Sequence, residues 1–170
     1  EKARMNSLVF MSPSKAFNMP GLASSYAIIE NDELRHQFQV YMEASEFSDG
    51  HLFAYLSVAA AYSDGTEWLD QVIAYIKGNI DFTESYLKER IPAIRMIRPQ
   101  ASYLIFLDCR ELGLNQEELN RLFVEDAHLA LNEGTTFGKE GEGFMRLNVA
   151  CPRATLEQAL RQLEQAVNNR

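Results

Sequence analysis

The longest regular pattern in this 170-residue chain lies between Gly65 and Pro92. Apolar side chains recur there every three or four positions, which predicts a single amphipathic helix of about 25 residues. Pro92 ends the helix, because the residue before a proline disfavours the helical conformation. One small domain seldom needs a helix of this length, so we expect residues 66–90 to connect two domains.

The segments on either side of this helix predict a mixed architecture, α/β before it and α+β after it. Residues 1–65 then form one part, 66–90 the connecting helix and 91–170 a small C-terminal domain. Because strand 7–11 and helix 51–62 are almost entirely apolar, we expect both to be buried. In chain order we expect strands at 7–11 and 25–29, a helix from Asp32, a break at 48–50, a helix at 51–62, strands at 94–97 and 103–107, a helix opened by a capping box at Asn115 and Glu118, strands at 129–131 and 144–149, and a last helix capped by Thr155.

The acidic charge balance excludes several classes of function. There are 16 Lys+Arg and 24 Asp+Glu, a net charge of -8, whereas nucleic acids and anionic membranes attract clustered basic residues. No apolar run approaches the roughly 20 residues of a membrane helix, and no signal peptide is evident. Cys109 and Cys151 are too few for a disulfide scaffold, so we expect a reducing, cytoplasmic location. Because His36, His51 and His128 are far apart, we expect no metal site.

Lys15 lies in a loop directly after the first apolar strand, between Ser12, Ser14 and Phe17. A partly desolvated lysine is a usable amine nucleophile toward carbonyl groups. The neighbouring serine hydroxyls can donate hydrogen bonds to a phosphate. An amine beside phosphate-binding hydroxyls is what a pyridoxal-phosphate site requires. The alternative is an exposed loop with a solvated lysine, which is the commoner state of this residue type.

Ser12 and Lys15 also match the S-x-x-K pattern of penicillin-recognising serine enzymes. Those enzymes need an S-D-N and a K-T-G element as well. Ser48-Asp49 and Ser63-Asp64 are each followed by glycine, and no Lys-Thr-Gly occurs. We therefore set this interpretation aside.

Residues 144–149 predict a strand with two different faces. Since alternate residues of a strand share a face, Phe144, Arg146 and Asn148 point one way and the residues between them point into the core. An arginine in mid-strand beside an asparagine can bind a carboxylate with two hydrogen bonds. The alternative is an exposed face with a surface salt bridge.

A glycine-rich segment, residues 134–143, precedes this strand. Its spacing matches neither G-x-x-x-x-G-K-[ST] nor G-x-G-x-x-G, so a phosphate cradle is disfavoured. We expect either a flexible loop that brings Arg146 to a ligand or a plain hairpin loop.

Two long motifs resemble one enzyme family. Residues 12–22, SPSKAFNMPGL, resemble the lysine segment of fold-type I pyridoxal-phosphate enzymes of the class I/II aminotransferase superfamily. Residues 137–153, FGKEGEGFMRLNVACPR, resemble the C-terminal signature of its MalY/PatB-type cystathionine β-lyase branch. The resemblance covers essentially the whole chain. It implies a homodimeric enzyme that acts on amino acids as a carbon–sulfur β-lyase or an aminotransferase.

The resemblance also implies roles for individual residues. Lys15 forms a Schiff base with the cofactor and then moves the substrate α-proton. Ser12 binds the cofactor phosphate, with Ser14 as a helper. Arg146 holds the substrate α-carboxylate, and Asn148 supports it.

Other parts of such a site have no counterpart in these residues. The aspartate at the pyridine nitrogen and the ring-stacking aromatic residue lie upstream of the lysine in this superfamily. The chain is therefore expected to be the C-terminal portion of a larger enzyme. Ala23 stands where aspartate-aminotransferase relatives carry a phosphate-binding arginine, which favours the β-lyase-like branch. The alternative is that the isolated fragment is a non-catalytic folded domain.

Overall fold

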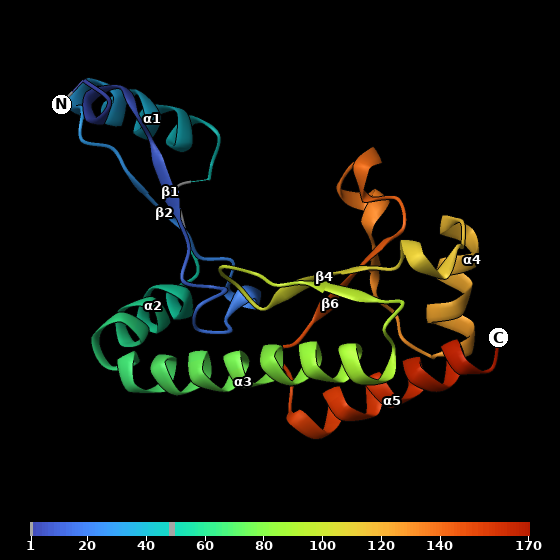
Figure 1. Cartoon of the computed structure of the whole chain (residues 1–170). Helices are drawn as coiled ribbons and strands as arrows, with labels where there is room; N and C mark the ends of the chain where they lie inside the picture. The colour runs from blue at the N-terminus through green and yellow to red at the C-terminus, as the bar shows by residue number, and fades with distance from the viewer. Residues whose placement is uncertain (1, 48–49) are drawn as a thin grey trace. The chain divides into compact units, whose positions relative to one another are not determined.

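A computed structural model describes residues 2–47 and 50–170. The chain forms two compact units, Glu1–Val72 and Ile73–Arg170, and the long helix α3 belongs to both (Figure 1). The elements are β1 (Val9–Met11), β2 (Tyr26–Ile28), α1 (Asp32–Ala44), α2 (Leu52–Asp64), α3 (Thr66–Arg90), β3 (Arg95–Ile97), β4 (Leu104–Asp108), α4 (Gln116–Arg121), β5 (Asn132–Glu133), β6 (Phe144–Asn148) and α5 (Arg153–Asn168).

The first unit contains a two-stranded antiparallel sheet and helices. β1 pairs with β2 so that Val9 faces Ile28 and Met11 faces Tyr26. Asn31 begins α1 because its side chain accepts hydrogen bonds from the backbone N–H groups of Glu33 and Leu34. α2 and the start of α3 follow.

The second unit is built on a four-stranded antiparallel sheet in the order β3-β4-β6-β5. Figure 1 shows α5 running alongside α3. Both helices contribute to one apolar core with the inward residues of β4 and β6. The residues that are 1% exposed or less in this core include Leu87, Ile105, Leu107, Phe123, Met145, Leu156, Leu160 and Leu163.

The two faces of this sheet differ as the sequence predicts. In β6, Met145 and Leu147 are buried, whereas Phe144, Arg146 and Asn148 are partly or fully exposed. β4 alternates in the same way, with Ile105 and Leu107 buried. Helices therefore cover one face of the sheet, and Arg146 lies on the other.

Several other predictions are confirmed. The class is mixed helix and sheet, and α3 covers 25 residues, Thr66–Arg90. The side chain of Asn115 accepts from Glu118 N–H while Glu118 accepts from Asn115 N–H, which completes the capping box. In the break predicted at 48–50, residues 48 and 49 lie outside the described residues. No helix in the described part of the chain is both long enough and apolar enough to cross a membrane.

The burial expected for two apolar segments of the first unit is wrong. All three residues of β1 are exposed, and Phe10 is 62% exposed. In α2 only Ala54 is buried, while Leu52 and Phe53 are exposed. Within the described residues β1 pairs with β2 alone, and the aromatic contacts of the two segments are local ones, Phe10 with Phe38 and Tyr62 with Phe17 and Tyr26, which leave most of their apolar side chains uncovered.

Two predicted boundaries in the second unit are also wrong. Residues 129–131 are not a strand: His128 has a φ of 55° and the N–H of Leu129 bonds to the Phe123 carbonyl, which turns the chain. The strand follows as β5. Thr155 does not cap α5, because the helix starts earlier, with Pro152 as its N-cap.

Candidate functional site

Lys15 lies in a tight turn that follows β1. The N–H of Phe17 donates to the Pro13 carbonyl and that of Met19 to the Ser14 carbonyl, both at 2.9 Å, which closes the turn. The Lys15 side chain is exposed, and its amine has no hydrogen bond or ion pair with residues 2–47 or 50–170. The partial desolvation considered for Lys15 is therefore not observed, and the amine is accessible to a carbonyl compound.

The two serines of this turn lie against each other. Ser12 Oγ is 2.8 Å from Ser14 Oγ and 2.7 Å from the carbonyl oxygen of Ser24. It also accepts a hydrogen bond from the N–H of Ser14 at 3.2 Å. A hydroxyl has only one proton, so when Ser12 donates to Ser24 the contact with Ser14 must use the Ser14 proton. The structure thus brings Ser12 and Ser14 together beside Lys15.

Phe17 anchors the Lys15 turn to the helices of the first unit. Its ring stacks on Trp68 with centroids 6.2 Å apart and meets Tyr62 edge-on at 5.7 Å. A Cβ added at Gly65 would lie 2.7 Å from the Phe17 ring. Because Gly65 has no side chain, the Phe17 ring can pack close to it and hold the Lys15 turn in place.

Arg146 lies in the middle of β6 with its guanidinium held by two neighbours. Its Nη2 donates to Asn132 Oδ1 at 2.7 Å. Its Cζ lies 4.4 Å from the ring centroid of Phe137. Its Nε is buried and has no acceptor among the described residues. None of the ion pairs found in residues 2–47 and 50–170 includes Arg146, so the surface salt bridge considered for it is not observed.

Asn148 shares the exposed face of β6 but is occupied locally. Its Oδ1 accepts a hydrogen bond from the N–H of Ala150 at 2.9 Å, which stabilises the turn that ends the strand. The residue is exposed and its amide Nδ2 makes no hydrogen bond with the part of the chain that the structure describes, so both of its donors are available to a ligand.

Asn79, on α3, anchors the end of the strand that carries Arg146. It is 0% exposed, and its Nδ2 donates to the carbonyls of Val149 at 2.8 Å and Cys151 at 2.9 Å. Its Oδ1 accepts from Nε of Arg153 at 2.9 Å. All the hydrogen-bonding groups of this buried amide except one lone pair are used, as buried polar groups require.

The predicted residues fall into two groups. Lys15, Ser12 and Ser14 share one turn of the first unit, and Arg146 and Asn148 share one strand of the second. Asn79, Asn132 and Phe137 also contribute to these two regions, although no motif or spacing in the sequence indicated them. Phe137 ends the short helical turn Gly134–Phe137, so the glycine-rich segment brings this ring to Arg146, which itself lies on β6.

Comparison with known proteins places these features in a family. The model of the aminotransferase class I and II family matches residues 1–163. The chain belongs to this family. It is 38% identical over 162 residues to the cystathionine beta-lyase PatB of Bacillus subtilis and 35% identical over 169 residues to the protein MalY of Escherichia coli. Crystalline cystalysin from Treponema denticola, which contains a pyridoxal 5'-phosphate cofactor, superimposes with a TM-score of 0.94 at 26% identity.

The match covers most of this chain but less than half of each relative. It includes 95% of the chain and 42% of PatB, 97% and 43% for MalY, and 99% and 43% for cystalysin. This member of the aminotransferase class I and II family therefore spans well under two thirds of the length of these relatives.

Neither cysteine of this family member is suited to act as a nucleophile. Cys109 is 1% exposed, and burial raises the pKa of its thiol to about 12, with the Asp108 charge contributing. Burial also raises the pKa of Cys151. Because the thiolate is the reactive form, a higher pKa makes both thiols less reactive at neutral pH.

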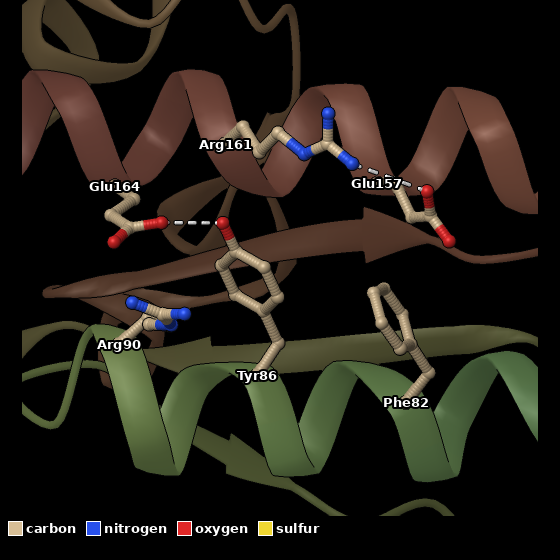
Figure 2. Close-up of a pocket in the computed structure, with 6 residues that line it drawn as sticks. All are labelled: Phe82, Tyr86, Arg90, Glu157, Arg161 and Glu164. Atoms are coloured by element: carbon tan, nitrogen blue, oxygen red, sulfur yellow. Dashed lines mark hydrogen bonds and ion pairs between the residues drawn. The ribbon is translucent and has the colours of Figure 1, made fainter.

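A hollow with a volume of about 420 Å³ lies between α3 and α5 (Figure 2). Tyr86 projects into it from α3 and donates a hydrogen bond to Glu164 of α5 at 2.5 Å. On the same helix as Glu164, Arg161 pairs with Glu157 at 3.4 Å. The contact between Tyr86 and Glu164 joins the two helices that cover the sheet.

Tyr86 is expected to make stability fall in strong alkali. Burial, and then the hydrogen bond to Glu164, raises its pKa to about 12, above the value of about 10 for an unfolded tyrosine. A raised folded-state pKa stabilises the fold fully below about pH 10, and this contribution is lost as the pH rises toward 12. Urea midpoints measured from pH 8 to 11.5 should fall less steeply in Tyr86→Phe than in the wild type. Tyr41→Phe, on exposed α1, is the control, and an unchanged slope in Tyr86→Phe would contradict the prediction.

Proposed function

We propose that this chain is the C-terminal part of a pyridoxal-phosphate-dependent enzyme that acts on amino acids, as a carbon–sulfur β-lyase or an aminotransferase. The observation that carries the proposal is the accessible amine of Lys15, which has no partner in residues 2–47 or 50–170, on the same turn as the hydroxyls of Ser12 and Ser14. The relatives named cystathionine beta-lyase support the lyase in particular.

The residues of the Lys15 turn fit the cofactor. An accessible primary amine can bond to an aldehyde, and serine hydroxyls and backbone N–H groups can donate to a phosphate. Lys15 would hold the aldehyde carbon, and Ser12, with help from Ser14, would hold the phosphate by turning its hydroxyl proton from the Ser24 carbonyl to the phosphate. When bound, pyridoxal phosphate supplies an electron sink for the charge that develops at the substrate Cα.

The remaining roles belong to side chains of this chain. Once the substrate amine has displaced it from the aldehyde carbon, the amine of Lys15 would take the proton from the substrate Cα as a general base and return it as a general acid. Arg146 would bind the α-carboxylate, because its guanidinium is free of a carboxylate partner among the described residues. Asn148, on the same face, would support this end of the substrate.

The organisation of the chain is part of the proposal. Residues 1–65 would be the end of the cofactor domain, 66–90 the connecting helix and 91–170 the small domain. The division of the structure within α3 supports this. The larger enzyme would be a homodimer, and a cytoplasmic location is supported by the two free cysteines.

Reduction of the full-length protein with borohydride in the presence of pyridoxal phosphate tests this proposal. The reduced Schiff base marks the lysine that holds the cofactor, and we expect peptide mapping to find the label on Lys15. Lys77→Ala, exposed on α3, should keep the label and Lys15→Ala should lose it. A label on another lysine in the wild type would disprove the role of Lys15. Product analysis with cystathionine, and with an amino acid and keto acid pair, then separates lyase from aminotransferase.

A second candidate describes the 170 residues on their own as a folded, non-catalytic fragment. The exposed β1 and α2 of the first unit favour it, since they contribute little core. Titrating the isolated chain with pyridoxal phosphate decides between the candidates. A saturable visible absorption band with substrate turnover excludes the non-catalytic fragment. If neither the band nor turnover is seen, the non-catalytic candidate is supported.

A further inference from the structure

We propose that Phe137 and Asn132 are positioning residues that hold the guanidinium of Arg146 in the orientation that binds a substrate carboxylate while leaving its charge uncompensated. The inference rests on the proposed role of Arg146 and adds two residues and a charge requirement to it.

Phe137 covers one face of the guanidinium. The distance from Arg146 Cζ to the ring centroid is 4.4 Å, within the range of a cation–π interaction. The ring is itself held edge-on by Phe106, with centroids 5.8 Å apart and an interplanar angle of 81°. Phe106 is the register partner of Arg146 across β4 and β6, so the residue that supports the Phe137 ring lies on the strand next to Arg146. Phe137 is 49% exposed, so core packing does not explain its place.

Asn132 holds one end of the guanidinium. It is the register partner of Arg146 across β5 and β6, so the two side chains lie on the same face of the sheet. Its Oδ1 accepts from Nη2 at 2.7 Å. Because the acceptor is a neutral amide, it fixes the direction of the guanidinium without cancelling its charge.

Arg110 shows the contrasting arrangement in the same unit. It too lies over an aromatic ring, with Cζ 4.9 Å from the centroid of Phe144. Unlike Arg146, it forms a two-point ion pair with Asp108, with Nε and Nη2 at 2.8 and 2.7 Å from the two carboxylate oxygens. An arginine so paired has little charge left for a ligand. The amide at position 132 therefore distinguishes a binding arginine from a structural one.

The orientation of the Arg146 guanidinium depends on its contacts with Phe137 and Asn132, because its other N–H donors have no partner in the described residues. Nε is buried without an acceptor, and no partner in residues 2–47 or 50–170 engages Nη1. With only a ring and one hydrogen bond holding the group, loss of either contact frees it to rotate. A carboxylate-binding arginine that must first be ordered binds less tightly, because ordering the side chain costs entropy.

The glycine-rich segment explains how Phe137 is held in place. Gly134 and Gly141 approach so closely that a Cβ at either would lie 2.1 Å from the other's carbonyl oxygen. Gly138, next to Phe137, has a φ of 133°, which other residues rarely adopt. The segment is thus a closed pair of turns that presents one aromatic ring.

Steady-state kinetics of the full-length enzyme, with KM and kcat measured separately, test the proposal. Phe137→Leu and Asn132→Ala should each raise KM for the amino-acid substrate by about 5- to 30-fold with kcat within about threefold. Phe137→Tyr, which keeps an aromatic ring, should have a KM close to that of the wild type, unlike Phe137→Leu. Asn132→Asp is the sharpest variant: it keeps an acceptor for Nη2 but adds a carboxylate, so KM should rise more than in Asn132→Ala.

Two further measurements separate positioning from a structural role. The inhibition constant of propionate, a carboxylate without an amino group, should rise in parallel with KM, and urea midpoints should show that Phe137→Tyr and Asn132→Asp remain folded. If Asn132→Asp binds substrate and propionate as the wild type does, the charge requirement is overturned. If Phe137→Leu leaves KM unchanged, the positioning role of the ring is overturned.

Arg146→Lys distinguishes failure of this inference from failure of the proposed function. A lysine keeps the charge but loses the planar fork, and KM should rise by about 10- to 100-fold. If it rises while Phe137 and Asn132 variants behave as wild type, the role of Arg146 stands and the positioning inference is wrong. If Arg146→Lys leaves KM unchanged, Arg146 does not bind the carboxylate and both fail.

Discussion

Replacing Lys15 by alanine in the full-length protein is expected to reduce turnover of an amino-acid substrate by about 10³-fold. Lys15 carries the only side-chain amine among residues 12–22, and it lies next to Ser12 and Ser14. Its loss removes the general base that takes the proton from the substrate Cα. The fold should be unaffected, because the side chain is exposed and the turn is closed by backbone hydrogen bonds from Phe17 and Met19. The measurement is kcat with saturating substrate and cofactor.

The control for this variant is Lys77→Ala, which removes an exposed lysine from α3 and should leave kcat unchanged. An added small primary amine should partly restore turnover in Lys15→Ala, since it can supply the missing base. If Lys15→Ala keeps more than about a tenth of the wild-type kcat, another group is the base and the assignment of Lys15 fails.

Replacing Asn79 by alanine is expected to lower the free energy of unfolding of the second unit by about 2–4 kcal/mol. The substitution leaves the carbonyls of Val149 and Cys151 without their donor and Nε of Arg153 without its acceptor. Each buried polar group left unpaired costs about 1–3 kcal/mol. The higher helix propensity of alanine offsets only a few tenths of a kcal/mol of this loss.

Urea titration followed by circular dichroism measures this loss, and hydrogen exchange locates it. The amide of Val149, which donates to the Tyr103 carbonyl at 3.0 Å, should exchange faster in Asn79→Ala. Lys77→Ala on the exposed side of the same helix controls for helix propensity and should be neutral or slightly stabilising. An Asn79→Ala protein as stable as this control would show that the three hydrogen bonds contribute little.

The strand that carries Arg146 shows what a local sequence pattern can predict and what it cannot. Alternation along residues 144–149 correctly predicted that Met145 and Leu147 are buried and that Arg146 lies on the opposite face. It could not reveal what touches the guanidinium. Asn132 reaches Arg146 through strand pairing and Phe137 through a turn closed by two glycines, and neither contact follows from spacing.

The apolar segments of the first unit show that composition can predict an element correctly and its burial wrongly. Composition predicted that strand 7–11 and helix 51–62 would be buried, and the secondary structure followed as β1 and α2. They are exposed within these 170 residues, which span 42% of PatB and 43% of MalY, because an apolar segment is buried only when another segment packs on it. Local periodicity determines the element but contains no information about its packing partner.

The sequence by itself determined the α3 helix, the capping box at Asn115, the two faces of β6 and the motifs that place the chain in its family. These properties depend on residues close together in the chain, through helical period, strand alternation and local hydrogen bonds. Only the tertiary structure decided that Asn79 bonds to Val149, that Phe137 and Asn132 hold Arg146, and that β1 and α2 are exposed. These depend on which distant segments meet, and that is a property of packing.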